Sequence, residues 1–204
     1  NNIWDIFYTV FSPLYFVSMI LMLAAYILVN CTVYAHMALY LKSEGEPVTF
    51  ESVFEKVKRD FFKVLLAAIA SFFVALFGVV FFIIPGIYLF VTLTLIQPIM
   101  VVEGLGFNEA FNRCFYLIKE KWWSTFGLIF ITSLIVNMCA VAFNIPTYIL
   151  QFANLMKWFP DISSFWQIIA SVISIAGTTL LSAILSIAIG IQYFNLVERR
   201  EGRG

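Results

Sequence analysis

Few side chains in the long apolar stretches of this sequence are of a type that does chemistry. The only ionisable one, apart from thiols and phenols, is His36, which we interpret as a satisfied interfacial residue, with ligand binding as the alternative. Glu103 and Glu198 follow apolar stretches and are most simply turn charges. The sequence contains no nucleophile-base pair, phosphate-binding loop or metal-spaced cluster of His, Cys, Asp and Glu. We therefore predict no catalytic, metal or cofactor site, and a protein that is not an enzyme.

Uncharged polar residues provide the remaining candidate site. Pro98 has no backbone N–H, so a helix that runs through it leaves the carbonyl one turn earlier without a partner. Gln97 is the adjacent group best able to satisfy that carbonyl or to hold a ligand. The candidate polar site comprises Gln97, Pro98, Thr94 and Asn137. A kink relieved by Thr94 is the simpler interpretation, and a polar cavity is the alternative. We expect most other polar residues of the apolar stretches to hydrogen-bond between helices, namely Asn30, Thr32, Thr92, Asn144, Thr178, Thr179, Gln192 and Asn195.

Composition places these residues in a membrane protein. The chain is 62% apolar and 12% charged, whereas a soluble domain averages about 25% charged residues. Its twelve basic and twelve acidic residues cancel, which removes the electrostatic case for a nucleic-acid partner.

Four stretches without charge must position the candidate site, at residues 6–41, 64–102, 122–156 and 162–197. Each is longer than the roughly 20 residues that a helix needs to cross a bilayer. The second is long enough to cross twice, and Pro85-Gly86 near its centre permits a tight reversal. We predict an all-α transmembrane bundle of about five membrane helices, at residues 13–41, 62–84, 87–102, 122–145 and 165–197.

The basic residues predict the orientation. Short loops rich in Lys and Arg stay in the cytoplasm. With five passes, Lys157 is the only basic residue on its side of the membrane, and all the others lie on the opposite side. We therefore expect the first residue outside and the C-terminus in the cytoplasm.

Two amphipathic helices are expected in the cytoplasmic interface, at residues 49–60 and 107–119. Thr49 is the expected N-cap of the first. Aromatic pairs follow both, Phe61-Phe62 and Trp122-Trp123, as interface anchors do. We interpret them as two copies of a repeated unit. Anchoring is the simpler role, and membrane sensing or partner docking is the alternative.

Small residues recur at every fourth position of the last membrane helix and form the candidate packing face. Such a row lets another helix approach closely in lipid. Packing within one chain is the simpler interpretation, and a homo-oligomer formed through this helix is the alternative. The face comprises Ala170, Ser174, Thr178, Ser182, Ser186 and Gly190.

Residues 1–204 are expected to form one integral membrane domain. The chain begins Asn1-Asn2 without a Met, and its first residue is expected outside. We therefore expect a fragment that lacks an N-terminal helix and a C-terminal tail.

Short motifs suggest a relationship. Ile84-Pro85-Gly86-Ile87-Tyr88-Leu89 is followed by residues 97–104, QPIMVVEG, and by residues 108–111, NEAF. These motifs resemble the multi-pass membrane domain fused to some glycerophosphodiester phosphodiesterases and related bacterial inner-membrane proteins. The resemblance implies a six-helix domain of the bacterial inner membrane without catalytic residues of its own. The phosphodiesterase activity of such fusions belongs to a separate soluble domain.

Two functions remain open at this stage. The first is a non-catalytic accessory or scaffold subunit with a protein partner in a membrane complex. The second is a carrier or lipid-handling protein with a site near Gln97 and Pro98, for which membrane lipid is the partner. An intramembrane enzyme lacks support, because paired catalytic groups at one depth are missing.

Overall fold

The computed structural model describes residues 13–43, 47–156 and 164–202, and every element within them is an α-helix. Five stretches are long and apolar enough to cross a membrane, which confirms the predicted all-α class and helix number. The helices are α2 (Pro13–Lys42), α3 (Phe50–Phe81), α4 (Ile83–Leu93), α5 (Ile96–Glu103), α6 (Phe107–Ile118), α7 (Trp122–Leu155) and α8 (Ser164–Glu201).

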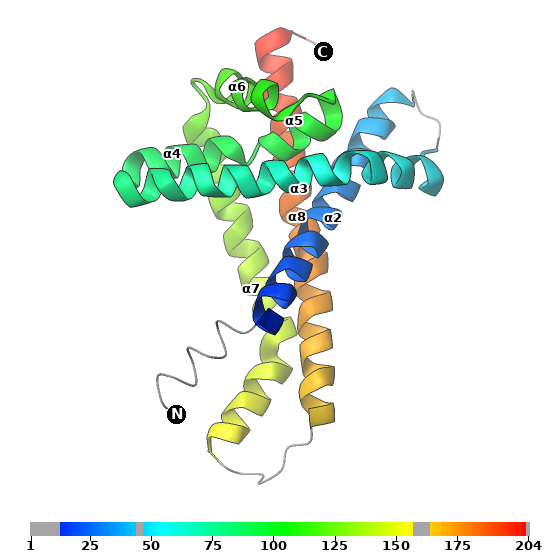
Figure 1. Cartoon of the computed structure of the whole chain (residues 1–204), viewed down its shortest axis with the longest axis vertical. Coiled ribbons are helices and arrows are strands. Elements are labelled where there is room, and N and C mark those ends of the chain that lie inside the picture. Colours follow the sequence, from blue (N-terminus) through cyan, green and yellow to red (C-terminus); the bar gives the residue numbers. More distant parts are fainter. Residues whose placement is uncertain (1–12, 44–46, 157–163, 203–204) are drawn as a thin grey trace.

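The helices run in two directions (Figure 1). The helices α7 and α8 pack side by side along the long axis of the molecule, and α2 joins them obliquely. The hairpin formed by α3 and α4 lies crosswise to α7 and α8. It lies toward the end of the molecule that holds α6 and the C-terminal ends of α2 and α8, which we call the basic end because Lys42, Arg199 and Arg200 lie in those last turns.

The first predicted amphipathic helix and the second membrane helix are one continuous helix, α3. The prediction of separate helices at 49–60 and 62–84 was wrong in this respect, because no Gly or Pro interrupts residues 50–77. The predicted N-cap is confirmed, since the Thr49 hydroxyl accepts a hydrogen bond from the backbone N–H of Ser52. The helix ends at Phe81, three residues earlier than predicted.

The predicted membrane helix at 87–102 consists of two helices, α4 and α5. Helix α4 ends at Leu93, and α5 begins at Ile96 after a break at Thr94 and Leu95. Pro98 therefore lies in the first turn of α5, where a backbone N–H would have no helical partner in any case. Thr94 and Leu95 keep right-handed helical backbone angles, so the expected kink is a short break after which α5 begins.

The remaining boundaries follow the predictions with extensions. Helix α6 matches the predicted 107–119 to within one residue. Helix α7 continues ten residues beyond the predicted end at 145, through Pro146, because a membrane helix tolerates the loss of one donor. Helix α8 covers the predicted 165–197 and continues to Glu201. The proposed missing segments and Lys157 lie outside the described residues.

The most buried element is α5, at the basic end. Ile96, Ile99 and Val101 are almost completely buried, and α5 packs against α2, α3, α6 and α8. In α7, by contrast, only Thr125 and Ala153 are buried. The buried core therefore lies at the basic end, and the other end consists mainly of α7 and α8 with outward apolar side chains.

Candidate functional site

A hydrogen-bonded group joins α2, α5 and α8 in the interior of the bundle. The Asn30 side chain donates from Nδ2 to Gln97 Oε1 at 3.0 Å, and Ser186 Oγ donates to Asn30 Oδ1. Asn30 is 3% exposed and Ser186 is 2% exposed. We call these three residues the polar clasp.

The polar clasp holds α5 in place by satisfying polar groups that would be costly to leave unpaired in an apolar interior. Asn30 is central, because its amide nitrogen and its amide oxygen serve different helices. The clasp contains no group that titrates in the ordinary range, so its chemistry is hydrogen bonding alone.

Three of the four predicted polar-site residues lie around the start of α5. Gln97 belongs to the clasp, and Pro98 is buried in the same turn. The Thr94 hydroxyl donates to the carbonyl oxygen of Val91 at 2.7 Å, where α4 ends. Asn137 lies apart from them, because it is exposed on α7 and its side chain donates to the carbonyl oxygen of Ser133.

A second buried polar pair links α7 to α8. Gln192 Nε2 donates to Thr125 Oγ1 at 3.0 Å. Asn30 and Gln192 thus make the interhelical hydrogen bonds expected of them, whereas Thr92 donates to the carbonyl oxygen of Tyr88 within its own helix.

An ion-pair cluster, which sequence reasoning missed, closes the basic end. Arg113 of α6 contacts Glu103 at the end of α5, with Nε to Oε2 at 3.0 Å, and also pairs with Glu201 at the end of α8. The Tyr193 hydroxyl donates to Glu103 Oε1 at 2.8 Å. These four residues form the cluster, and they join three helices.

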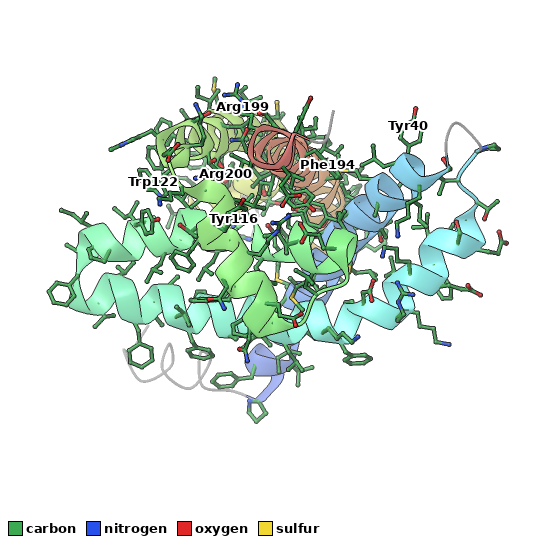
Figure 2. All side chains as sticks on the ribbon, turned by 90° about the horizontal axis from the view of Figure 1, so that it is seen from above. Tyr40, Tyr116, Trp122, Phe194, Arg199 and Arg200 are labelled. Carbon is green, nitrogen blue, oxygen red and sulfur yellow. The ribbon has the colours of Figure 1, made fainter. Side chains whose placement is uncertain are left out.

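The Tyr116 ring extends this cluster. The guanidinium groups of Arg113 and Arg200 lie 5.5 Å and 5.4 Å from its centroid, and Figure 2 shows Arg200 and Tyr116 beside each other. Arg200 also donates to the carbonyl oxygen of Lys119 at 2.9 Å. The end of α8 is therefore fixed to α6 by both charge and ring contacts.

The cluster is partly shielded from solvent, with about one-fifth of each ionic side chain exposed. Burial alone would lower the pKa of Arg113, but its hydrogen bond to Glu201 and its contacts with Glu103 outweigh this, and the net shift of the pKa is upward. The sequence signal was a Glu and an Arg ten residues apart across a glycine turn, and Gly104 adopts φ 73° there.

The candidate packing face serves two neighbours within the chain. Toward α7, the Ser174 hydroxyl donates to the carbonyl oxygen of Phe143, and Thr147 Oγ1 approaches the carbonyl oxygen of Ala170. Toward α2, a Cβ on Gly190 would lie 2.6 Å from Met37 Sδ. Thr178 and Ser182 are partly buried. The four fully buried members of the row are thus covered within one chain.

A leucine at position 186 should therefore destabilise the protein strongly. The change Ser186→Leu adds volume to a buried contact and removes the hydrogen bond to Asn30, for an expected loss of about 2–4 kcal/mol in the free energy of unfolding. Thermal unfolding in mild detergent measures it. The matched control is Ile187→Phe, at an exposed neighbour, which should change little. Equal effects would show that position 186 is not in a packed contact.

Two cavities lie outside the clasp, and none of its three residues lines either of them. One of about 430 Å³ lies between α2 and α3, and one of about 610 Å³ lies between α2, the start of α3 and α8. Among the described residues, no group of three or more His, Cys, Asp and Glu side chains is placed to hold a metal ion. The larger cavity is lined by Thr32, Val33, His36, Met37, Val48, Thr49, Phe50, Val53 and Ile187.

The fold places the described chain in a class, the all-helical bundle, and five of its apolar segments are long enough to cross a membrane. Residues 7–196 match the family described as a domain of unknown function, DUF7847, and the chain belongs to this family. No curated protein and no solved structure matches the chain.

Proposed function

We propose that the chain is a non-catalytic multi-pass membrane protein that serves as an accessory or scaffold subunit of a membrane complex. In this proposal it resides in the bacterial inner membrane with its C-terminus in the cytoplasm, as the distribution of basic residues favours.

The observation that carries the proposal is the closed polar clasp. Asn30 bonds to Gln97 and to Ser186, so its polar groups join helices and do not line a cavity. A carrier needs polar groups that exchange partners with its cargo. A bundle whose interior side chains satisfy one another is suited to hold its shape and to present its outer faces to a partner protein.

The second candidate, lipid handling, is favoured by the cavity of about 610 Å³. Its lining is mainly apolar, and it includes His36 near the basic end of α2. A cavity of this size is in the range of small-molecule and lipid-chain sites. In this version, membrane lipid is the cargo and the cavity, not the polar clasp, is the site.

The resemblance to domains fused to phosphodiesterases leads to a separate proposal, that this chain has no hydrolase activity of its own. Glu103 lies within the motif of residues 97–104 on which the resemblance depends, and it is engaged by Arg113 and by Tyr193. Phosphodiesterase activity that copurifies with the chain and disappears in Glu103→Gln would contradict this proposal.

Purification in a mild detergent, followed by identification of copurifying proteins and lipids, tests the two functions. The variant is Gln97→Leu, and the matched control is Gln192→Leu, which removes the second buried amide. For a scaffold, both variants should lower the melting temperature by a few degrees while each folded protein retains the same protein partner.

A different outcome would support lipid handling. If Thr32→Trp, which fills the cavity of about 610 Å³, loses a copurifying lipid at a constant folded fraction, while Gln97→Leu retains it, the cavity is a lipid site and the scaffold proposal fails. The absence of any stoichiometric protein partner from the unmodified chain would also count against a scaffold.

A further inference from the structure

The hairpin of α3 and α4 lies crosswise to α7 and α8, which run along the long axis of the molecule (Figure 1). Both arms are apolar enough to cross a bilayer by composition. Helices that lie crosswise to one another cannot all cross a flat bilayer along its normal.

The return arm is interrupted. Helix α4 has 11 residues, which corresponds to about 16 Å, and the chain then breaks at Thr94 and Leu95 before α5 begins. The hydrocarbon core of a bilayer is about 30 Å thick. Helix α4 alone covers only about half of that thickness, and the arm matches it only together with the eight residues of α5, as the apolar span Ile83–Glu103 of 21 residues.

The contact between Tyr88 and Trp122 gives the level of the tip. Trp122 Nε1 donates to the Tyr88 carbonyl oxygen at 3.3 Å, and the two rings stack with centroids 5.8 Å apart. Trp122 directly follows the charged turn 119–121, so it lies at the interface on the basic end. Ile84, at the tip, is four residues from Tyr88, or about 6 Å along α4. The tip therefore lies close to that interface and not across the membrane from it.

The surface of the tip indicates what surrounds it. Ile83 is 68% exposed and Ile84 is 82% exposed, and the outer side of α3 exposes Phe72, Phe73 and Phe77. Residues 64–102 carry no charge, whereas the root of α3, residues 50–63, carries four basic and three acidic side chains, namely Lys56, Lys58, Arg59, Lys63, Glu51, Glu55 and Asp60. At the turn itself, the backbone N–H groups of Phe82 and Gly86 donate to the carbonyl oxygens of Gly78 and Phe82, and Pro85 has no N–H, so three of the five residues 82–86 present no free backbone donor to lipid.

From these observations we propose that the α3–α4 hairpin lies within the leaflet at the basic end and does not cross the membrane. Its partner is the hydrocarbon of that one leaflet, with the charged root of α3 among the headgroups. Only α2, α7 and α8 then span the bilayer. The side on which each remaining loop lies is unchanged, because a hairpin returns the chain to the side from which it started.

Cysteine accessibility tests the proposal in the full chain. Native Cys31, Cys114 and Cys139 are replaced, and single cysteines are introduced as Ile84→Cys at the tip, Met156→Cys at the far end of α7 and Lys119→Cys at the basic end. In intact cells, an impermeant maleimide should label only the Met156→Cys chain. The Lys119→Cys chain should become labelled after permeabilisation. Labelling of the tip from the same side as position 156 would overturn the proposal.

A distance measurement covers the case in which the hairpin crosses the membrane but its tip is not accessible to the maleimide. Spin labels at positions 84 and 119 of the chain in lipid nanodiscs should be less than about 25 Å apart, since the tip is one helical turn from Tyr88. Labels at 119 and 156 serve as the long reference, because α7 has 34 residues and extends about 50 Å. A separation of about 30 Å or more between positions 84 and 119 would place the tip across the membrane and would also overturn the proposal.

Discussion

Replacing Gly86 with Ala is expected to lower the free energy of unfolding by about 3 kcal/mol, near the upper end of overpacking costs. A Cβ at position 86 would lie 2.4 Å from the backbone nitrogen and 2.5 Å from the Cα of Val79, which no side-chain rotation can relieve. The hairpin arms would have to separate, and the packing of α4 against α3 would be lost along its length.

Gly127→Ala is the matched control for that change. Gly127 is also helical, but nothing lies within 4 Å of a Cβ built there. The higher helix propensity of Ala should leave this variant unchanged or more stable by up to about 1 kcal/mol. Melting temperatures of both variants in the same detergent provide the comparison. Equal stability of the two would mean that α3 and α4 do not approach as closely as described.

The second large effect is expected at the ion-pair cluster. Arg113→Gln leaves the carboxylates of Glu103 and Glu201 near each other without their shared cation. Removing one partner of a buried ion pair costs about 3–5 kcal/mol, and the partial exposure here reduces the expected loss to about 1–3 kcal/mol. The end of α8 should then detach from α6.

Two further variants separate the role of Arg113 from a general effect of charge. Arg113→Lys keeps the charge but not the fork that reaches two carboxylates, so it should restore only part of the stability. Lys121→Gln removes an exposed charge and should change little. Limited proteolysis of the C-terminal end of α8 measures the detachment. If Lys121→Gln and Arg113→Gln behave alike, the cluster does not hold the helix.

Local sequence features predicted most of the helices because their signals are local. The Thr49 cap, the Pro85-Gly86 reversal and the amphipathic pattern of α6 each depend on residues within about one turn. The division of 87–102 into α4 and α5 was not predicted, because an apolar run containing one proline is compatible with either a kinked helix or a helix start. Pro98 correctly indicated where the helix is interrupted, and the tertiary packing around α5 determines that a new helix begins there.

The candidate site was predicted only in part, for a similar reason. Gln97 was identified from its neighbour Pro98, but its partner Asn30 lies 67 positions away in the chain, and Ser186, which donates to Asn30, lies 156 positions from Asn30. Neither was paired with Gln97 in advance. Asn137 was grouped with Gln97 on polarity alone, and its own helix satisfies it. The ion-pair cluster was missed because Arg113 was interpreted only as one of the basic residues that set the orientation of the chain in the membrane. Residue type shows which groups need partners, whereas the crossing of helices determines which partners they find.

The concentration of buried side chains at the basic end has a consequence for how the molecule comes apart. The far halves of α7 and α8 pack mainly against each other, with contacts such as Phe143 against Gly177 and Thr147 against Ser174. Separating these halves should require less free energy than disrupting the packing around α5. Each helix would keep its internal hydrogen bonds in lipid. The first step of unfolding would therefore be the separation of two intact helices. A probe of the distance between side chains of α7 and α8 would detect this step, whereas the helix content would not change.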